Sequence, residues 1–462
     1  MGWLEHDAEE IRDNCFKVIQ QGLTNAYRNG IQKEDIKTIG LTNQRETVVA
    51  WNKHTGKPYY NSIVWNDQRT SDICSKWIDL HKGNKNVHSQ INGLPINTYF
   101  SAFKIKWLLE NVEGLKKEQD QGNVLYGTMD SWIVWNLTNK LHITDVSNAS
   151  RTYLMNLNNL KYEQSIIKEF DINGKSLPEI RSSSEEYDKI KFEPLSGIPL
   201  GSILGDQQAA SLGHGLFDIG NSKNTYGSGC FLLVNQGENI QIQPKTNLLT
   251  TVLYQLGKNA KPVYAFEGSI EAGALTLNWA RDKLNLYTDF NDLQSQIDSV
   301  QDNGGVYFVP TLNGAFSPYW DPSATGTMVG MSLYTQKGHI LRSILESIAY
   351  RTKDVINEVE KNGIKIDYLN VDGGVTDNKF LMHFQSDLLQ KPIIKNKILD
   401  STCMGAAFAA GLSAGIYKDL NEIKSFIEVE EEIQHNQQNR EIFQQYYKNW
   451  EKAIPRALNW EK

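Results

Sequence analysis

The chain has 462 residues with a formal net charge of −7, and hydrophobic residues make up 40% of it. This length suits two or three domains, and the composition is that of a globular protein with a large core. The acidic balance argues against nucleic-acid binding, which normally needs a basic surface. We expect no membrane insertion, because the longest apolar stretch, Met404 to Tyr417, is too short to span a bilayer and is typical of a closely packed core helix.

The cysteines and histidines of the chain follow no metal or disulfide pattern. The four cysteines, Cys15, Cys74, Cys230 and Cys403, lie far apart in the sequence and do not follow the spacing of a disulfide framework or a zinc site. The histidines do not follow the spacing of metal ligands either. We therefore expect free thiols in a reducing, cytoplasmic compartment and no metal site built from protein ligands alone. Residues 1–13 are rich in carboxylates and are unlike a secretory signal.

The first half begins with a predicted helix from the N-cap Asp7 to a stop at Gly30, because apolar residues recur at helical spacing between them. Strands are expected over 36–42 and 47–51 and an apolar run over 63–65, with helices near 100–111 and 128–137. An apolar run, "IPLGSIL", then leads into "LGDQQAASLG".

The second half begins with three strand-like segments, which predict a β-meander: "KNTYGSGCFLLVN", "TNLLTTVLYQL" and "KPVYAFEG". Helices are then expected at 270–284, 339–362, 379–389 and 402–416, with strands at 305–312, 326–333, 366–374 and 391–396. This alternation predicts an α/β fold. If the two halves are copies of one lobe, the first begins without the opening meander.

Three segments place polar or glycine residues where strands end. Arg45 and Glu46 follow a strand. They either bind a polyhydroxylated ligand at the sheet edge or form an ordinary ion pair on a surface turn. Gly227 and Ser228 form either a phosphate-binding nest or a tight hairpin. The glycine pair Gly373–Gly374 lies either in a nucleotide site or in an ordinary turn between a strand and a helix that Asp377 or Asn378 caps.

Asp206 in "LGDQQAASLG" is open to two interpretations that are compatible. An aspartate before a helix is a good N-cap. A carboxylate held at a helix N-terminus also keeps its charge, as a catalytic base requires.

Taken together, the segments resemble the FGGY family of carbohydrate kinases over essentially the whole chain. Two family signatures fit in full, "YFSAFKIKWLLEN" at 99–111 and "GTMVGMSLYTQKGHILRSILE" at 326–346. Further matches occur in order: "GWLEHDAEEI", "IGLTNQRETVVAWNKHTGKP", "SIVWNDQRT", "DVSNASRTYLMN", "GDQQAA", "KNTYGSGCF", "PYWDP", "LESIAYRTKDV" and "DGGVTDNKFLMHFQSD".

The resemblance implies an α/β fold of two ribonuclease-H-like lobes around a cleft, as in actin and hexokinase. The implied lobes are 1–213, which binds glycerol, and 214–462, which binds the nucleotide. The implied activity is ATP-dependent phosphorylation of glycerol to sn-glycerol 3-phosphate, with ATP and Mg²⁺, in the cytoplasm, by a homodimer or homotetramer. Two alternatives stay open: another sugar or polyol kinase of the family, such as one for xylulose, and a non-catalytic relative.

The resemblance also assigns site residues by position. Asp206 is the expected catalytic base. The expected glycerol contacts are Arg45, Glu46, Trp65, Tyr99, Asp206, Gln207 and Phe231. The expected ATP contacts are Gly227, Ser228, Ala274, Asn278, Gly374 and Asn378, with serine at 228 where the family usually has threonine.

The sequence departs from the family pattern at several places. Asn97 and Thr98 replace the usual Asp-Pro, and the loop "KFEPLSGIPLG" lacks the Gly/Arg-rich allosteric pattern, so regulation by fructose bisphosphate is not expected. The family opens with a strand and a D-x-G-T-T-S loop that helps hold phosphates and Mg²⁺. The chain begins after that loop, so we identify no metal ligands, expect the first lobe to lack its opening meander, and expect low stability or little activity of the chain as written.

Overall fold

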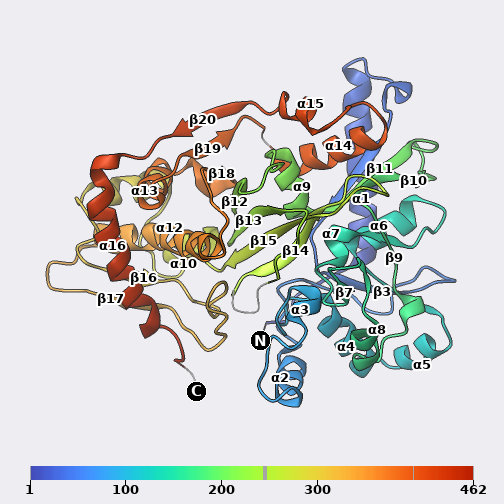
Figure 1. Ribbon diagram of the computed structural model, residues 1–462, viewed down its shortest axis with the longest axis horizontal. Helices are drawn as coiled ribbons and strands as arrows, with labels where there is room; N and C mark the ends of the chain where they lie inside the picture. Colours follow the sequence, from blue (N-terminus) through green and yellow to red (C-terminus); the bar gives the residue numbers. More distant parts are fainter. Residues whose placement is uncertain (1, 243–246, 399, 461–462) are drawn as a thin grey trace.

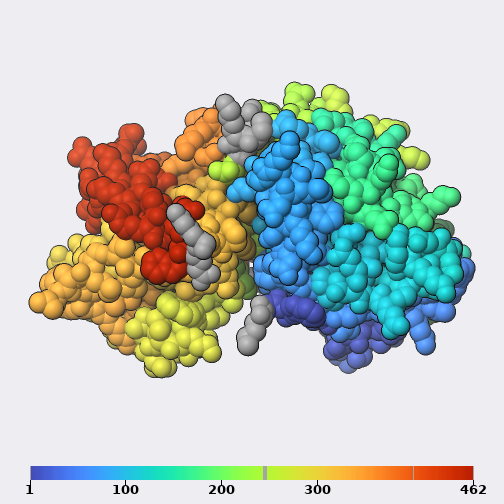
Figure 2. Space-filling view, turned by 90° about the horizontal axis from the view of Figure 1, so that it is seen from below, coloured from blue at the N-terminus to red at the C-terminus, as the bar shows by residue number. Residues whose placement is uncertain are grey.

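The computed structural model describes residues 2–242, 247–398 and 400–460. Figure 1 shows two α/β masses, one built from the first half of the chain and the other from the second. Seen from below in Figure 2, the two masses meet along a central groove. A pocket lies between them, lined by Gln68, Cys74 and Thr98 on one side and by Asn313, Phe316 and Trp320 on the other.

The first half of the chain forms two main sheets. One is antiparallel with the order β1-β4-β3-β5, and the other has the order β10-β11-β2, with β11 parallel to β2. Its strands are β1 (Glu5–His6), β2 (Ile39–Asn43), β3 (Val48–Asn52), β4 (Ser62–Ile63), β5 (Val124–Thr128), β6 (Ile143–Asp145), β7 (Met155–Asn156), β8 (Lys161–Tyr162), β9 (Glu179–Arg181), β10 (Ser184–Lys189) and β11 (Pro199–Gly205). Its α-helices are α1 (Ala8–Arg28), α2 (Ser71–Leu80), α3 (Ser89–Asn92), α4 (Ser101–Asn111), α5 (Leu115–Asp120), α6 (Met129–Leu137), α7 (Val146–Ala149), α8 (Gln164–Glu169) and α9 (Asp206–Gly213).

The second half is organised around a seven-stranded sheet with the order β14-β15-β13-β12-β18-β19-β20. Its strands are β12 (Ser222–Tyr226), β13 (Cys230–Gly237), β14 (Leu249–Tyr254), β15 (Val263–Ile270), β16 (Tyr307–Val309), β17 (Thr327–Val329), β18 (Leu369–Asp372), β19 (Ile393–Asn396) and β20 (Val429–Ile433). Its α-helices are α10 (Ala274–Asp282), α11 (Phe290–Asp298), α12 (Lys337–Lys361), α13 (Lys379–Leu389), α14 (Ser401–Ser413), α15 (Leu420–Lys424) and α16 (Arg440–Ala453).

Most predicted elements are confirmed, and local chemistry explains why. Asp7 caps α1, and its carboxylate accepts the backbone N–H groups of Glu9 and Glu10. The predicted helices at 100–111, 128–137 and 379–389 correspond to α4, α6 and α13 within one residue. Within the described ranges, no helix combines the length and the apolar character that crossing a bilayer requires.

The predicted meander is wrong in its spatial order. The first of its three segments folds into two strands, β12 and β13, and β15 then lies between β13 and β14. Alternating apolar residues identify a strand, but they do not identify its neighbours. Strand β14 pairs with β15 and not with β13, the strand before it in the chain, which no local pattern reveals.

Helix α14 crosses from the second half of the chain to pack against α9, β11 and β2 of the first, as Figure 1 shows. The contact is close because glycine faces backbone. A methyl group at Gly405 of α14 would overlap the carbonyl of Ala209, and one at Gly213 of α9 would overlap the carbonyl of Ser401. This packing confirms the close-packed helix predicted for the apolar stretch from Met404, although the helix itself ends at Ser413.

The α9–α14 contact makes a prediction about stability. Gly405→Ala should lower the free energy of unfolding by about 1–3 kcal/mol or more, because the added methyl group forces two backbones apart. Gly22→Ala is the matched control, since Gly22 also lies within a helix but has open space around it, and this change should stabilise by up to about 1 kcal/mol. Denaturant unfolding measures both, and equal effects would contradict the packing argument.

Candidate active site

The parallel strands β2 and β11 end at the same sheet edge, where Asn43 faces Gly205. Arg45 and Glu46 follow the first strand, and Asp206 follows the second. The Arg45 side chain crosses directly over Gly205, where a Cβ atom would lie 2.7 Å from its aliphatic carbons. Glu46 has a left-handed backbone with φ 58°, which non-glycine residues adopt only where the surroundings hold them.

A buried ion-pair network joins the two halves of the chain at this edge. The Nη1 and Nη2 atoms of Arg45 donate to the two carboxylate oxygens of Glu267 at 2.7 and 2.9 Å. Arg151 Nη2 lies 3.3 Å from Glu267 Oε1, and Arg151 Nε donates to Glu46 Oε1 at 2.5 Å. Glu267 belongs to β15, so a carboxylate of the second half holds two guanidinium groups of the first.

The charges of this network stabilise one another. Burial alone would raise the pKa of Glu267, but Arg151 and Arg45 lower it to about 2. Burial raises the pKa of Glu46, against the opposing effect of the same two arginines. The carboxylate of Glu267 therefore stays ionised near neutral pH, and the guanidinium groups that it pairs with are fixed in place.

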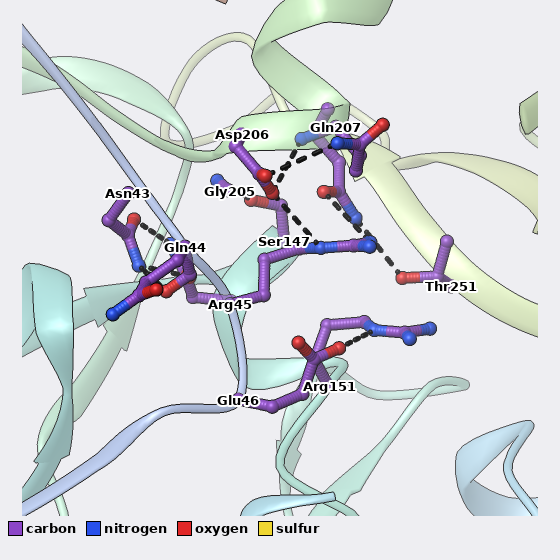
Figure 3. A network of polar contacts seen from close by, with 12 residues as sticks. Asn43, Gln44, Arg45, Glu46, Ser147, Arg151, Gly205, Asp206, Gln207 and Thr251 are labelled. Carbon is purple, nitrogen blue, oxygen red and sulfur yellow. Dashed lines mark hydrogen bonds and ion pairs between the residues drawn. The ribbon is translucent and has the colours of Figure 1, made fainter. Parts of the chain in front are cut away.

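Asp206 lies at the solvent-facing end of this network. Its side chain is 37% exposed, whereas that of Arg45 is 2% exposed, and Arg45 Nε lies 3.3 Å from Asp206 Oδ1. Figure 3 shows the Arg45 side chain reaching toward this carboxylate. The predicted N-cap role is wrong, because Gly205 is the N-cap of α9 and Asp206 is its first helical residue, which accepts the N–H of Gln207 at 2.8 Å. Its charge still lies at the helix N-terminus.

Lys223 of β12 brings a second buried cation to Asp206. Its Nζ atom donates to Gln207 Oε1 and, at 2.7 Å, to Thr225 Oγ1. Burial lowers the pKa of Lys223 to about 8, against the opposing effect of Asp372 and Asp206. Gln207 is thereby held beside Asp206, with its amide nitrogen donating to Asp206 Oδ2 at 3.2 Å.

Three aromatic side chains, each predicted from the resemblance, gather beside the network. The ring of Trp65 lies 5.6 Å from that of Tyr99 and 5.9 Å from that of Phe231, measured between centroids. The guanidinium of Arg151 lies 5.2 Å from the Tyr99 ring, which ties the aromatic cluster to the ion pairs. Trp65 and Tyr99 come from the first half and Phe231 from the second, so the cluster also joins the two halves.

The predicted glycine turns also come together. Strands β12 and β18 are parallel neighbours, so the turn at Gly227 and Ser228 lies beside the turn at 373–374. The N-terminus of α10 closes on the first turn, where the N–H of Ala274 donates to the Gly227 carbonyl at 2.8 Å. Asn378 caps α13 by accepting the N–H of Leu381 at 2.8 Å, as one of the two predicted caps.

The remaining two predicted nucleotide contacts are both accessible to solvent. Gly374 is exposed with open space around it, and Asn278 is partly exposed on α10. The sequence did not single out Gly273, just before α10. A Cβ atom there would lie 2.6 Å from the Gly227 carbonyl, so the close approach of the two turns needs glycine at this position.

Sequence reasoning also missed Glu267, Arg151 and Lys223. All three lie in segments that we identified, but no role follows from their local pattern. A signal was present for Glu267, because it is a carboxylate inside the apolar strand "KPVYAFEG" and needs a buried cation.

Comparison with known proteins identifies the family. The model of the FGGY family of carbohydrate kinases, N-terminal domain, matches residues 1–213, and that of the C-terminal domain of the same family matches residues 222–414. This chain therefore belongs to the FGGY family of carbohydrate kinases, and the resemblance inferred from its motifs is confirmed.

Individual relatives support the same conclusion. A glycerol kinase from Brucella anthropi is 44% identical over 464 residues, which cover 99% of this chain and 91% of that protein. A glycerol kinase from Clostridium perfringens is 44% identical over the same shares. The structure of Plasmodium falciparum glycerol kinase with ADP superposes with a TM-score of 0.90 at 36% identity, covering 99% of this chain and 90% of that one.

The predicted fold class is confirmed by these matches. A xylulose kinase from Lactobacillus acidophilus shares the fold with a TM-score of 0.86 at 21% identity, covering 100% of this chain and 91% of that one. Two α/β lobes of the actin and hexokinase type, with a cleft between them, are the architecture of this protein.

The buried network makes a prediction about stability and pH. Glu267→Gln should lower the free energy of unfolding by about 3–5 kcal/mol at pH 7, because two buried guanidinium groups lose their shared carboxylate. The pKa of Glu267 is lowered from 4.5 to about 2, so its stabilisation is present above pH 4.5 and is lost as the pH falls toward 2. Denaturant unfolding should therefore show the difference between the two proteins shrinking as the pH falls below 4.5.

A matched control is Glu238→Gln, which removes a carboxylate from a surface pair with Lys261. We expect no measurable change in stability from it. A constant difference between the Glu267 variant and the unsubstituted chain down to pH 3 would show that the Glu267 charge does not stabilise the fold.

Proposed function

We propose that this chain catalyses the ATP-dependent phosphorylation of glycerol to sn-glycerol 3-phosphate. The observation that carries the proposal is the partly exposed carboxylate of Asp206, which is held by buried Arg45 and Gln207 in an ion-pair network that Arg151 connects to an aromatic cluster. The 44% identity to proteins named glycerol kinase supports the same substrate.

In the proposed reaction, Asp206 accepts the proton of a terminal glycerol hydroxyl, and the hydroxyl oxygen attacks the γ-phosphorus of ATP. The new oxygen–phosphorus bond forms as the bond to the β-phosphate breaks, and ADP leaves. Because Arg45 and the Gln207 N–H both contact the carboxylate of Asp206, this carboxylate is held in one orientation. Positioning of this kind accounts for much of the rate in phosphoryl transfer.

The substrate pocket is assigned from two kinds of side chain. Arg45, Glu46 and Gln207 hydrogen-bond the glycerol hydroxyls, and Trp65, Tyr99 and Phe231 pack against its carbon skeleton. The assignment is supported by their arrangement, since the ion-pair network and the aromatic cluster meet where Arg151 contacts the Tyr99 ring.

The nucleotide is assigned to the face where the two glycine turns meet. Backbone N–H groups near Gly227 and Ser228 approach the phosphates, and Ala274, Asn278, Gly374 and Asn378 line the adenosine side. Mg²⁺ bound with ATP takes one or two carboxylates together with phosphate oxygens, and it neutralises charge on the transferred group. Asp206 is the partly exposed carboxylate of this site, but it already faces the cations of Arg45 and Lys223 and is assigned to the proton, so phosphate oxygens and water would supply most ligands of the ion.

We also infer a cytoplasmic location, which the four free cysteines support, and an assembly of two or four copies. Sedimentation of the purified chain distinguishes a monomer from a dimer or tetramer.

The catalytic assignment predicts a large and specific loss of rate. Asp206→Asn should lower kcat for glycerol by about 10²–10⁴-fold relative to the unsubstituted chain, because the amide cannot accept the proton. Affinity for ATP should stay within about threefold. Transfer of labelled phosphate from ATP to glycerol measures the rate, including very slow rates.

Asp218→Asn is the control for this experiment, since Asp218 is an aspartate on the loop after α9 with a side chain that is 71% exposed. It should leave kcat unchanged. If Asp206→Asn keeps more than a tenth of the rate, Asp206 is not the base.

The pocket assignment predicts a change in substrate binding. Trp65→Ala should lower kcat/KM for glycerol by about 10–200-fold, because the carbon skeleton loses an apolar wall, and should leave KM for ATP unchanged. Tyr334→Ala, which removes an aromatic ring that is 68% exposed, is the control and should have no effect.

A panel of polyols and sugars completes this test. Glycerol should give the highest kcat/KM, whereas a preference for xylulose would favour another kinase of the family. No phosphate transfer to any member of the panel would favour a non-catalytic relative.

A further inference from the structure

Two histidines and a glutamate form a cluster on the first lobe, away from the Arg45–Asp206 network. His81 directly follows α2, His88 directly precedes α3, and Glu169 is the last residue of α8. The Nε2 atom of His81 lies 2.7 Å from Glu169 Oε1, and the Nε2 atom of His88 lies 3.3 Å from Glu169 Oε2. One nitrogen or oxygen atom from each residue lies within 4.8 Å of the others.

This set of donors matches a known kind of metal site. Two imidazole nitrogens and one carboxylate, with a fourth position left to water, are a common way to bind Zn²⁺. Donor atoms around a tetrahedral zinc ion lie ~3.4 Å apart, given bond lengths of about 2.0–2.2 Å. The two nitrogen–oxygen separations in the cluster, 2.7 and 3.3 Å, lie below this value, and small side-chain rotations that move these donors apart bring all three to one ion.

The surroundings favour the form of the cluster that binds metal. The other ring nitrogen of His88, Nδ1, lies 3.2 Å from the Tyr153 hydroxyl, and such a hydrogen bond orients the ring and leaves Nε2 as the ligand. A neutral imidazole is the state that a metal ion needs.

Solvent can reach all three side chains, so an ion has a path to the site. The exposed fractions are 22% for His81, 13% for His88 and 22% for Glu169. The residual exposure also leaves room for a water molecule as the fourth ligand.

We propose that His81, His88 and Glu169 form a binding site for a divalent transition-metal ion, with Zn²⁺ as the best-fitting ion. This site differs in chemistry from a Mg²⁺ site, which is built from oxygen ligands and phosphate. The proposal departs from the expectation of no protein-only metal site, which rested on local spacing; the third ligand lies 81 residues after the second, where no local spacing reveals it.

The site has a consequence for the contact between the lobes. The segment between the two histidines carries Lys85, whose Nζ donates to the Trp320 carbonyl at 3.2 Å. Just beyond α3, the Gly93 carbonyl accepts the N–H of Thr250 at 3.0 Å. Trp320 and Thr250 belong to the second lobe, so an ion that fixes both ends of the 81–88 loop stabilises this bridge.

The test is Zn²⁺ binding to the full chain after metal has been removed by chelator dialysis. Competition with a chromophoric chelator should show one equivalent bound with a Kd of about 1 µM or tighter. His88→Ala and Glu169→Gln should each weaken binding by at least about tenfold. His54→Ala is the matched control, because His54 is exposed on a turn outside the cluster, and it should bind as the unsubstituted chain does.

Two further measurements keep the outcome clear. Co²⁺ added in place of Zn²⁺ should give visible absorption bands of a tetrahedral site, and Glu169→Gln should abolish them while the thermal melt of the metal-free protein shows that it is folded. Affinity should fall as the pH is lowered, because both imidazoles must be deprotonated. A chain that binds no Zn²⁺ at this level, or cluster variants that bind as tightly as the His54 variant, would overturn the proposal and leave a hydrogen-bonded His–Glu–His cluster.

Discussion

The carboxylate of Glu267 is the interaction on which the rest of the site depends. It comes from β15 of the second lobe and lies between Arg45 and Arg151 of the first. A buried charge is costly unless it is paired, so the two lobes cannot separate here without leaving Glu267 unpaired and Arg45 and Arg151 with only Asp206 and Glu46 as partners. The direction of Arg45, and through it the position of Asp206, is therefore set by the join between the lobes and not by either lobe alone.

Much of the fold follows from short-range patterns in the sequence. Helices α1, α4, α6 and α13 were predictable because apolar spacing and capping residues act within one helix. Arg45 and Glu46 were singled out because they follow a strand, but only the family resemblance grouped them with Asp206 and Gln207; the structure brings them together because the parallel strands β2 and β11 end at one edge. The distinction between Gly205 and Asp206 as the N-cap was not, because one residue decides it and both types are common caps.

The parts that sequence could not predict are those that depend on distant partners. Arg45 and Glu267 are 222 residues apart, and Glu267 alone shows only that some cation must reach it. The order of β13, β15 and β14 depends on how the chain crosses between them, which hydrophobic alternation does not encode. The proposed metal-binding cluster also depends on a distant partner. Two histidines seven residues apart do not indicate a metal site until the fold places Glu169 beside them.

Helices α9 and α14 approach one another at backbone distance at Gly213 and Gly405, and Leu212, Ala406 and Ala409 pack beside this contact. Most helix pairs can absorb a small shift when side chains between them change rotamer, but glycine against backbone leaves little such freedom. A displacement of α14 is therefore passed on to α9 almost undiminished. Because Asp206 is the first residue of α9, we expect the carboxylate to move with a helix from the other lobe, as one end of a rigid lever.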